Sequence, residues 1–311
     1  MKVAIIGRTS ILYNCAKILL DNHFEIPLII TSKEAPEYTI NSNDFKKLAE
    51  DIGAKFIYTP KINEEEIITN ILSLGEIDLA VSINYSGVIS QKVINLFRFG
   101  VLNAHGGDLP KYRGNACQAW ALINGEKKIG LCIHKMIGGE LDSGPIISRE
   151  YFNVDINTRI GQVYDWIESE TPKLVLQSVN EIKKNKNFVL EYQSLNPSDS
   201  LRCYPRNPSD GKIDWGKSNE DILRLINASS EPFSGAFTSL NEQQVIIWRA
   251  EIYENDENYL AVSGQISTIN KTDGSIIVIC GLSKLRITEI EIDGQRGLPE
   301  TMISSIRKRL I

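Results

Sequence analysis

Short apolar runs alternate with amphipathic stretches over the first half of the chain. The runs predict buried β-strands near residues 2–6, 26–31, 56–58, 77–83 and 99–102. The stretches between them carry apolar residues at helical spacing and predict α-helices. Strands that alternate with helices are typical of a parallel, doubly wound sheet, so we expect an α/β, Rossmann-like fold.

A different pattern follows residue 195. Residues 196–210 are rich in Pro, Ser, Asn and Asp and predict a linker. Beyond it, apolar runs separated by turn residues predict short strands near 235–240, 244–252, 263–270, 275–280 and 283–291. Such strands favour a smaller, OB-like β-barrel, which a helix over 298–310 could close. We therefore expect a catalytic domain over 1–195 and a C-terminal β domain over 211–311.

Chemically useful side chains follow the strand near residue 100. If this strand persists through residue 104, Asn103 and His105 point to the same face, because side chains alternate along a strand. Ligands of open α/β sheets sit outside the carboxyl ends of the strands. An amide donor beside an imidazole suits acyl transfer, since the amide stabilises a developing oxyanion and the imidazole moves the proton.

Asp142 lies in the glycine-rich loop 138–144 and could complete this group. Two interpretations stay open: a carboxylate that approaches His105 and raises its pKa, or an aspartate that makes turn hydrogen bonds. We interpret His134 as a hydrogen-bonded structural histidine. Together with Cys132 it offers too few ligands for a metal site, and Cys117 falls within a predicted helix, which argues against a cysteine nucleophile.

Two other strand ends carry polar residues. The turn holding Arg8 and Ser10 could bind an anion at a helix N-terminus or be a plain strand-to-helix turn. It has one glycine and no G-x-G-x-x-G pattern, which gives little support for a dinucleotide cofactor. Tyr85 follows the strand near 77–83, and we favour a pocket wall over ordinary packing for its ring.

Composition narrows the setting and the partner. The 311 residues are 42% hydrophobic and contain no apolar run long enough to span a membrane. Five cysteines without a CxxC pair favour a reducing compartment, so we expect a cytoplasmic protein. Residues 197–311 carry 13 basic and 16 acidic side chains, a net charge of −3. This balance argues against nucleic acid, and against tRNA in particular.

Three motifs together resemble the folate-dependent formyltransferase family. They are Asn103-x-His105, Leu109-Pro110-x-x-Arg113-Gly114 and Leu141-Asp142-x-Gly144. The likeness extends over roughly the first 190 residues. The chain length and the stretch Arg202–Trp215 resemble the two-domain branch, which holds methionyl-tRNA formyltransferases and sugar-nucleotide N-formyltransferases.

This resemblance implies N10-formyltetrahydrofolate as donor, a primary amine as acceptor and no metal. His105 would be the acid/base group, Asn103 would stabilise the oxyanion and Asp142 would raise the pKa of His105. The implied folate contacts are Tyr85, Gly87, Val88, Ile89, Asn115, Gly138, Gly139, Glu140 and Leu141. The expected acceptor contacts are Arg8, Ser10, Lys111, Arg113 and Arg206. One departure is Gly107-Asp108, where many members carry Ser-Leu, and it places an extra acid beside the site.

The loop over residues 32–43 bears on the acceptor. In tRNA formyltransferases this loop is long and basic, whereas here it offers Lys33 against Glu34 and Glu37. We therefore expect a nucleotide-linked amino sugar, with dTDP-4-amino-4,6-dideoxyglucose of lipopolysaccharide O-antigen synthesis as the first choice and UDP or GDP carriers next. The alternatives are a methionyl-tRNA formyltransferase and a formyltetrahydrofolate hydrolase. A homodimer is compatible with the resemblance.

Overall fold

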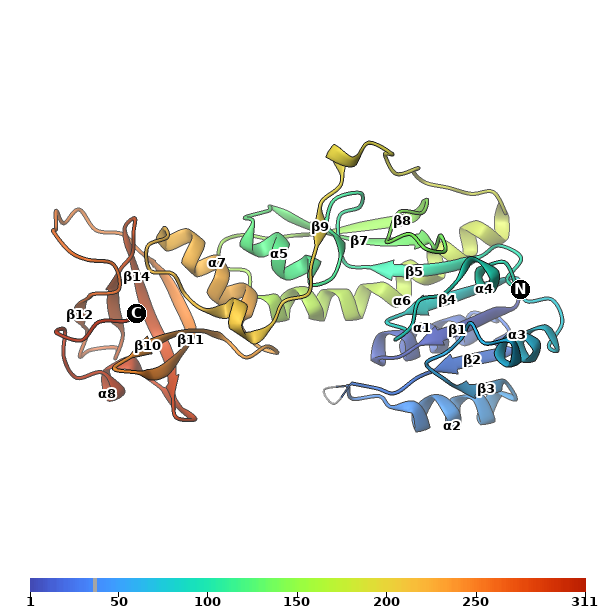
Figure 1. The fold of residues 1–311 in the computed structure, drawn as a ribbon, viewed down its shortest axis with the longest axis horizontal. Coiled ribbons are helices and arrows are strands. Elements are labelled where there is room, and N and C mark those ends of the chain that lie inside the picture. The colour runs from blue at the N-terminus through green and yellow to red at the C-terminus, as the bar shows by residue number, and fades with distance from the viewer. Residues whose placement is uncertain (36–37) are drawn as a thin grey trace. The chain divides into compact units, whose positions relative to one another are not determined.

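A computed structural model describes residues 1–35 and 38–311 (Figure 1). Glu37, which entered the charge count of its loop, lies outside the described residues. The chain divides into two compact units. The first comprises Met1–Gly114, Gly130–Phe152 and Asp165–Arg202. The second comprises Asn115–Ile129, Asn153–Tyr164 and Cys203–Ile311. The expected boundaries at 195, 196–210 and 211 stay a prediction.

A seven-stranded sheet forms the centre of the first unit. Its spatial order is β3 (Lys55–Tyr58), β2 (Leu28–Thr31), β1 (Val3–Gly7), β4 (Leu79–Ile83), β5 (Val101–His105), β7 (Lys128–Lys135) and β8 (Ile146–Asn153). The strands from β3 to β5 are parallel, and β7 runs antiparallel to β5. Every residue of β1 and β4 is buried, which explains why these strands are apolar except for Ser82. The predicted Rossmann-like sheet is confirmed.

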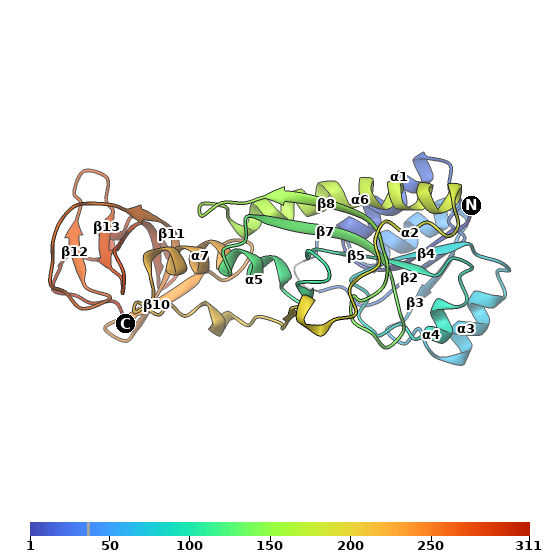
Figure 2. The ribbon, with the colours of Figure 1, turned by 90° about the horizontal axis from the view of Figure 1, so that it is seen from above.

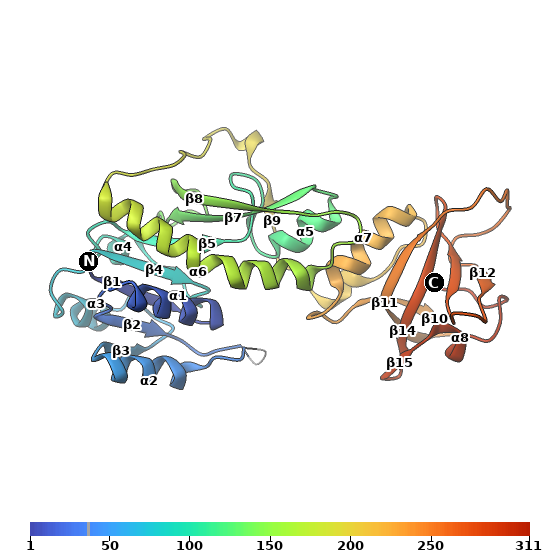
Figure 3. The same ribbon diagram turned by 180° about the vertical axis from the view of Figure 1, so that it is seen from behind.

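Helices cover both faces of this sheet. Figures 2 and 3 show α1 (Ser10–Asp21) and the part of α6 that belongs to the first unit on one face, with α3 (Glu65–Leu72) and α4 (Gln91–Ile94) on the other. The isoleucines of α3 pack with alternate residues of β1, β2 and β4 in one hydrophobic cluster. The helix α2 (Ser42–Ile52) begins with a capping box at Asn41 and Asp44 and packs near the β2 and β3 edge.

The helix α6 (Ile160–Lys184) differs from expectation. Pro172 predicts the start of a new helix, but it lies inside one continuous helix. Proline lacks an N–H, so the carbonyl of Glu168 loses its helical partner there. The preceding Thr171 hydroxyl donates to the Ile167 carbonyl at 2.6 Å and adds a bond within the same turn. Sequence rules for proline describe isolated helices, and packing keeps this one intact.

The second unit contains an antiparallel β domain, as predicted. Its sheet has the order β10 (Ala236–Leu240), β11 (Gln243–Tyr253), β14 (Lys284–Ile292), β13 (Ile276–Ile279) and β12 (Ile266–Ile269), with β15 (Gln295–Gly297) paired to β14. The second unit also holds α5 (Cys117–Ile123), η2 (Pro208–Gly211), α7 (Asn219–Ser229) and α8 (Pro299–Met302). The elements β6 (Arg113–Gly114) and η1 (Pro197–Asp199) belong to the first unit, and β9 (Arg202–Cys203) lies at the boundary.

The end of the chain links the two outer strands of this sheet. Ser239 of β10 exchanges two backbone hydrogen bonds with Ile311, and the Leu310 N–H donates to the Gly264 carbonyl just before β12. Leu310 is buried in the core of the domain. The closing helix expected over 298–310 is therefore wrong beyond Met302, because these residues form a turn and then make backbone hydrogen bonds with the outer strands.

Candidate functional site

Four polar side chains meet at the carboxyl end of β5. Asn103 and His105 come from β5, His134 comes from β7, and Asp142 comes from the loop that follows β7. Asp142 Oδ2 lies 3.5 Å from Nδ1 of His105, and Asp142 Oδ1 lies 3.5 Å from Nε2 of His134. The structure thus brings together the amide, the imidazole and the carboxylate that the sequence singled out.

His105 lies between a backbone carbonyl and a carboxylate. Its Nε2 lies 2.7 Å from the Tyr112 carbonyl, which can only accept, so Nε2 carries the proton. Burial lowers the pKa of His105 below its usual range, and it outweighs Asp142, which acts in the opposite direction. The expectation that Asp142 raises the pKa of His105 is confirmed for the effect of that carboxylate, although burial lowers the net pKa of the ring. Neutral His105 therefore has its lone pair on Nδ1, facing Asp142.

Asp142 is a carboxylate held in place by its surroundings. Its backbone has φ 47°, and its Oδ2 accepts the Gly114 N–H at 3.0 Å. Burial raises the pKa of Asp142, but the two histidines and the Gly114 N–H favour the charged form and lower it to about 2. Asp142 is thus ionised at neutral pH. Its carboxylate accepts a hydrogen bond from Gly114, which lies outside its own turn, so Asp142 does more than stabilise that turn.

His134 was interpreted as a structural histidine, yet it belongs to this group. Its Nδ1 lies 3.0 Å from the Lys135 carbonyl, which can only accept, so Nδ1 donates; Nε2 lies 3.1 Å from the Asn103 amide nitrogen, which can only donate, so Nε2 accepts. This contact orients the Asn103 amide. The signal that could have found His134 is strand pairing, because Asn103 stands opposite His134 in the β5–β7 register.

Gln193 is a second residue that sequence reasoning missed. Its side chain is buried, and its amide nitrogen donates to the carbonyls of Asp142 and Gly144 at 2.8 and 2.7 Å. Its oxygen accepts from the Arg113 guanidinium at 2.7 Å. Gln193 therefore ties the Asp142 loop to Arg113. It lies in a polar stretch without periodicity, so no sequence signal marks it.

A cavity of about 290 Å³ opens beside these groups. It is lined by Gly87, Val88, Ile89, His134, Met136, Ile137, Gly139, Glu140, Leu141 and Asp142. Six of these are expected folate contacts. The mostly apolar walls, with exposed backbone at two glycines, fit a flat aromatic ring that also needs hydrogen bonds to backbone groups.

Two expected folate contacts lie behind the cavity wall. The Tyr85 hydroxyl donates to the Thr59 carbonyl at 2.7 Å, and burial raises the pKa of Tyr85 to about 12. Its ring packs under Gly87, where an added Cβ would lie 3.2 Å from it. The Gly138 N–H donates to the Gln91 side chain at 2.9 Å. Both residues support the wall from outside.

The expected acceptor contacts of the first unit have partners of their own. Arg8 donates to the carbonyls of Lys33 and Asn84, and the Ser10 hydroxyl donates to Glu168 at 2.6 Å. Lys111 is exposed, whereas Arg113 is half-buried and bonded to Gln193. Of these residues, Lys111 has the side chain most open to a ligand.

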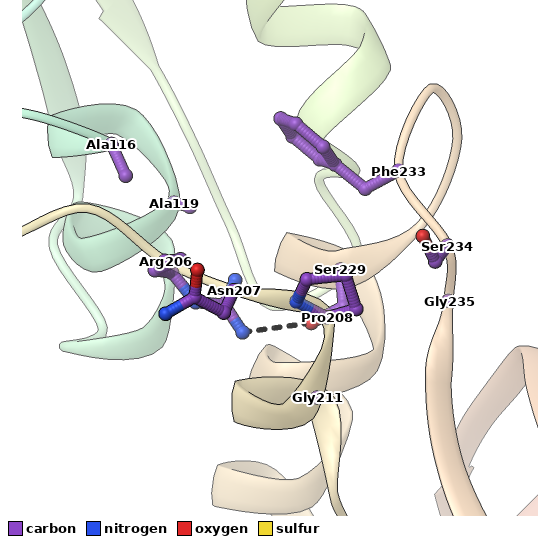
Figure 4. Close-up of a pocket in the computed structure, with 10 residues that line it drawn as sticks. All are labelled: Ala116, Ala119, Arg206, Asn207, Pro208, Gly211, Ser229, Phe233, Ser234 and Gly235. Carbon is purple, nitrogen blue, oxygen red and sulfur yellow. Dashed lines mark hydrogen bonds between the residues drawn. The ribbon is translucent and has the colours of Figure 1, made fainter.

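Arg206 and Asn115 belong to the second unit. Arg206 lines a cavity of about 140 Å³ together with Phe233, and it donates to the Ser229 hydroxyl at 3.1 Å (Figure 4). It also donates to the carbonyls of Ala228 and Asp210. These bonds join the end of α7 to η2, which is a structural use of the guanidinium.

The described residues hold neither a metal-binding cluster nor a membrane-spanning helix. Within residues 1–35 and 38–311, no group of three or more His, Cys, Asp or Glu side chains is arranged to hold a metal ion. No helix in the part of the chain that the structure describes is long and apolar enough to cross a bilayer.

Comparison with known proteins relates this geometry to a family. The sequence matches the formyl transferase family over residues 1–179 and the formyl transferase C-terminal domain over residues 206–304. A methionyl-tRNA formyltransferase of Halothermothrix orenii is 29% identical over 271 residues, covering 86% of this chain and 83% of the relative. The bifunctional polymyxin resistance protein ArnA of Wigglesworthia glossinidia brevipalpis is 30% identical over 100% of this chain and 46% of that protein.

Solved structures share the fold. WlaRD, a sugar 3N-formyl transferase, superimposes with a TM-score of 0.67 at 19% identity, over 95% of this chain and 98% of that one. HypX from Aquifex aeolicus gives a TM-score of 0.60 at 15% identity, and this chain spans about half (49%) of its length. The sequence match covers more than half of the chain and includes Asn103, His105 and Asp142, so the protein belongs to the formyl transferase family.

Proposed function

We propose that this enzyme transfers the formyl group of N10-formyltetrahydrofolate to the primary amine of a nucleotide-linked amino sugar. The observation that carries the proposal is the meeting of Asn103, His105 and Asp142 beside a largely apolar cavity. These three are the proposed catalytic residues. The cavity residues Gly87, Val88, Ile89, Gly139, Glu140 and Leu141 are the proposed folate contacts.

The proposed roles follow from the hydrogen bonds of the free site. When bound, the donor supplies a formyl carbon already activated as an amide with a competent leaving nitrogen. Asn103, oriented by His134, has a second N–H for the negative charge that builds on the formyl oxygen. Neutral His105 accepts the proton of the attacking amine at Nδ1, where Asp142 stabilises the imidazolium.

Charge supports a sugar nucleotide as the acceptor. Residues 197–311 have a net charge of −3, and the loop over 32–43 lacks a basic excess. A sugar N-formyltransferase, WlaRD, matches nearly the whole chain in fold. Within this class we propose a dTDP-linked 4-amino-4,6-dideoxy sugar of O-antigen synthesis. The five cysteines are free and buried, which fits action in the cytoplasm.

Methionyl-tRNA formylation is the second candidate, because sequence similarity favours it. Relatives with that name match up to 96% of the chain at 25–29% identity. An enzyme that grips tRNA neutralises several phosphates, so its binding weakens steeply as salt rises. Sugar-nucleotide binding depends on fewer charges and should weaken less.

An acceptor screen tests the proposal. Purified enzyme and 10-formyltetrahydrofolate are mixed with dTDP-, UDP- or GDP-linked amino sugars, or with charged initiator tRNA, and products are analysed by mass spectrometry. We expect one formyl group on an amino sugar, and none with a His105→Ala variant. Formylation of the tRNA alone would establish the second candidate. Formate release without any acceptor would indicate a formyltetrahydrofolate hydrolase.

A further inference from the structure

The loop between β5 and β6 presses closely on the ring of His105. A Cβ added at Gly107 would lie 2.5 Å from His105 Nε2 and 2.4 Å from the Tyr112 carbonyl oxygen. No side chain fits at that distance, so glycine is required as long as the loop keeps this path. The same approach places the Tyr112 carbonyl 2.7 Å from Nε2. The position of this loop therefore decides where the imidazole and its proton lie.

A buried arginine holds the loop on its outer side. Arg149 of β8 donates to the Leu109 carbonyl at 2.7 Å and to the Asp108 carboxylate at 3.1 Å. The Tyr151 hydroxyl donates to the same carboxylate at 3.0 Å. The Arg149 side chain is only 14% exposed, and Asp108 is 28% exposed. Asp108 is thus turned away from His105 and neutralised by Arg149, although its position in the chain places an acid beside the site.

The surroundings of Arg149 indicate a fixed position. Its second terminal nitrogen also lies 3.0 Å from Glu191, and its buried Nε finds no hydrogen-bond partner among the described residues. Cys132 Sγ donates to the Gly107 carbonyl at 3.3 Å and fixes the inner side of the loop. The loop is therefore held at Gly107, Asp108 and Leu109 before it reaches Tyr112. Charge-assisted bonds give such an anchor more directional precision than apolar packing would.

We propose that Arg149 and Asp108 form a clamp that sets the Tyr112 carbonyl against His105, which makes Arg149 a positioning residue for the proposed catalytic histidine. The inference rests on the proposed function only for the role of His105. The other charged or titratable groups that act on this ring are Asp142, His134 and Arg113. The clamp thus acts on the hydrogen bond that His105 Nε2 donates to the Tyr112 carbonyl.

Histidine NMR on the free protein tests the clamp. The chain has three histidines, so the imidazole N–H signals of a protein with ¹⁵N-labelled histidine are simple to assign. We expect a protected Nε2–H signal for His105 in the wild type. In Arg149→Met its exchange with water should accelerate on the order of tenfold, because the loop opens more often. The His134 Nδ1–H, bonded to Lys135, serves as an internal reference that should not change.

Matched variants separate the clamp from general destabilisation. Arg149→Lys should restore part of the protection, and Glu150→Gln, an exposed neighbour on the same strand, should leave it unchanged. If Arg149→Met does not fold, Asp108→Asn removes the charge partner and should also accelerate exchange. Unchanged exchange of the His105 proton in the folded variants would overturn the clamp. No acceptor enters this measurement, so its result is independent of the outcome of the acceptor screen.

Discussion

Two histidines face one carboxylate in this site, and their hydrogen bonds give them different tasks. His134 donates from Nδ1 to the Lys135 carbonyl and accepts at Nε2 from the Asn103 amide, so both of its ring nitrogens are hydrogen-bonded. His105 donates from Nε2 to the Tyr112 carbonyl and has a lone pair on Nδ1, next to Asp142. Burial keeps that ring neutral at rest. A neutral imidazole next to a carboxylate is suited to accept a proton, whereas a permanently charged one is not.

Replacing Asn103 tests the charge-stabilising role at the scale of one residue. Asn103→Ala removes the amide that points between His134 and the reacting group. Loss of one such donor should raise the barrier by about 3–4 kcal/mol, a reduction in kcat of roughly a hundredfold to a thousandfold. Steady-state kinetics with the acceptor found in the screen would measure it. Asn22→Ala, at an exposed helix end, is the control. A kcat within a few-fold of wild type would contradict the role.

The pKa of His105 also predicts how stability depends on pH. Its folded pKa lies below the unfolded value of 6.5, so the unfolded chain binds more protons between these two values. Lowering the pH through this window should therefore reduce the free energy of unfolding. The contribution of Asp142 is lost only at lower pH, between 3.8 and about 2. The two windows do not overlap near neutrality.

Urea unfolding of the wild type and of His105→Gln, at about pH 5.5 and about pH 7.5, measures this effect. The variant lacks the titrating group, so its free energy of unfolding should fall less on acidification. The comparison uses the change with pH, and any constant cost of the substitution cancels. Parallel losses in the two proteins would mean that burial of His105 does not couple to folding.

At the scale of elements, the strands and most helices of the first unit could be predicted. The strands β1 and β4 are apolar except for Ser82 because both faces are covered, and such runs are recognisable in the sequence. The elements that were missed depend on contacts distant in sequence. The helix α6 continues through Pro172, and the residues beyond α8 leave the helix, with Ile311 bonded to Ser239. The place of His134 in the site likewise depends on the pairing of β7 with β5.

The segment after α6 offers a test of this kind of distant contact. Gln193→Leu keeps the side-chain volume but leaves two buried carbonyls and the Arg113 guanidinium without their bonds. Loss of these partners should lower the free energy of unfolding on the order of 2 kcal/mol, and the looser Asp142 loop should lower kcat. Tyr192→Leu, at a neighbouring exposed position, should change stability little. Equal stabilities of the two variants would show that Gln193 is not a tether.

At the scale of the whole molecule, the sequence predicts the proposed catalytic groups better than it predicts the acceptor. Asn103, His105 and Asp142 were recognisable because the resemblance carries them in short motifs. The acceptor depends on surface charge and loop shape, and expected contacts such as Arg8 and Arg206 prove to be engaged in bonds within the protein. The sequence alone does not show that the guanidinium of such an arginine is hydrogen-bonded within the protein.

The second unit depends on its final residues. Deleting residues 309–311 removes the buried Leu310 and the backbone bonds to Ser239 and Gly264. The cost should be about 3 kcal/mol, comparable with the loss of one large buried side chain. Thermal unfolding of the shortened protein, compared with Arg307→Ala, would measure it. A melting temperature equal to that of the control would contradict the role of this segment.

The segment over residues 309–311 has a further consequence for solubility. It occupies peptide groups of β10 and of the residues before β12 that would otherwise face outward. Unpaired peptide groups along a strand are a template on which a second molecule can add its own strand. The shortened protein should therefore form oligomers at concentrations where the intact chain does not, through contacts unrelated to formyl transfer.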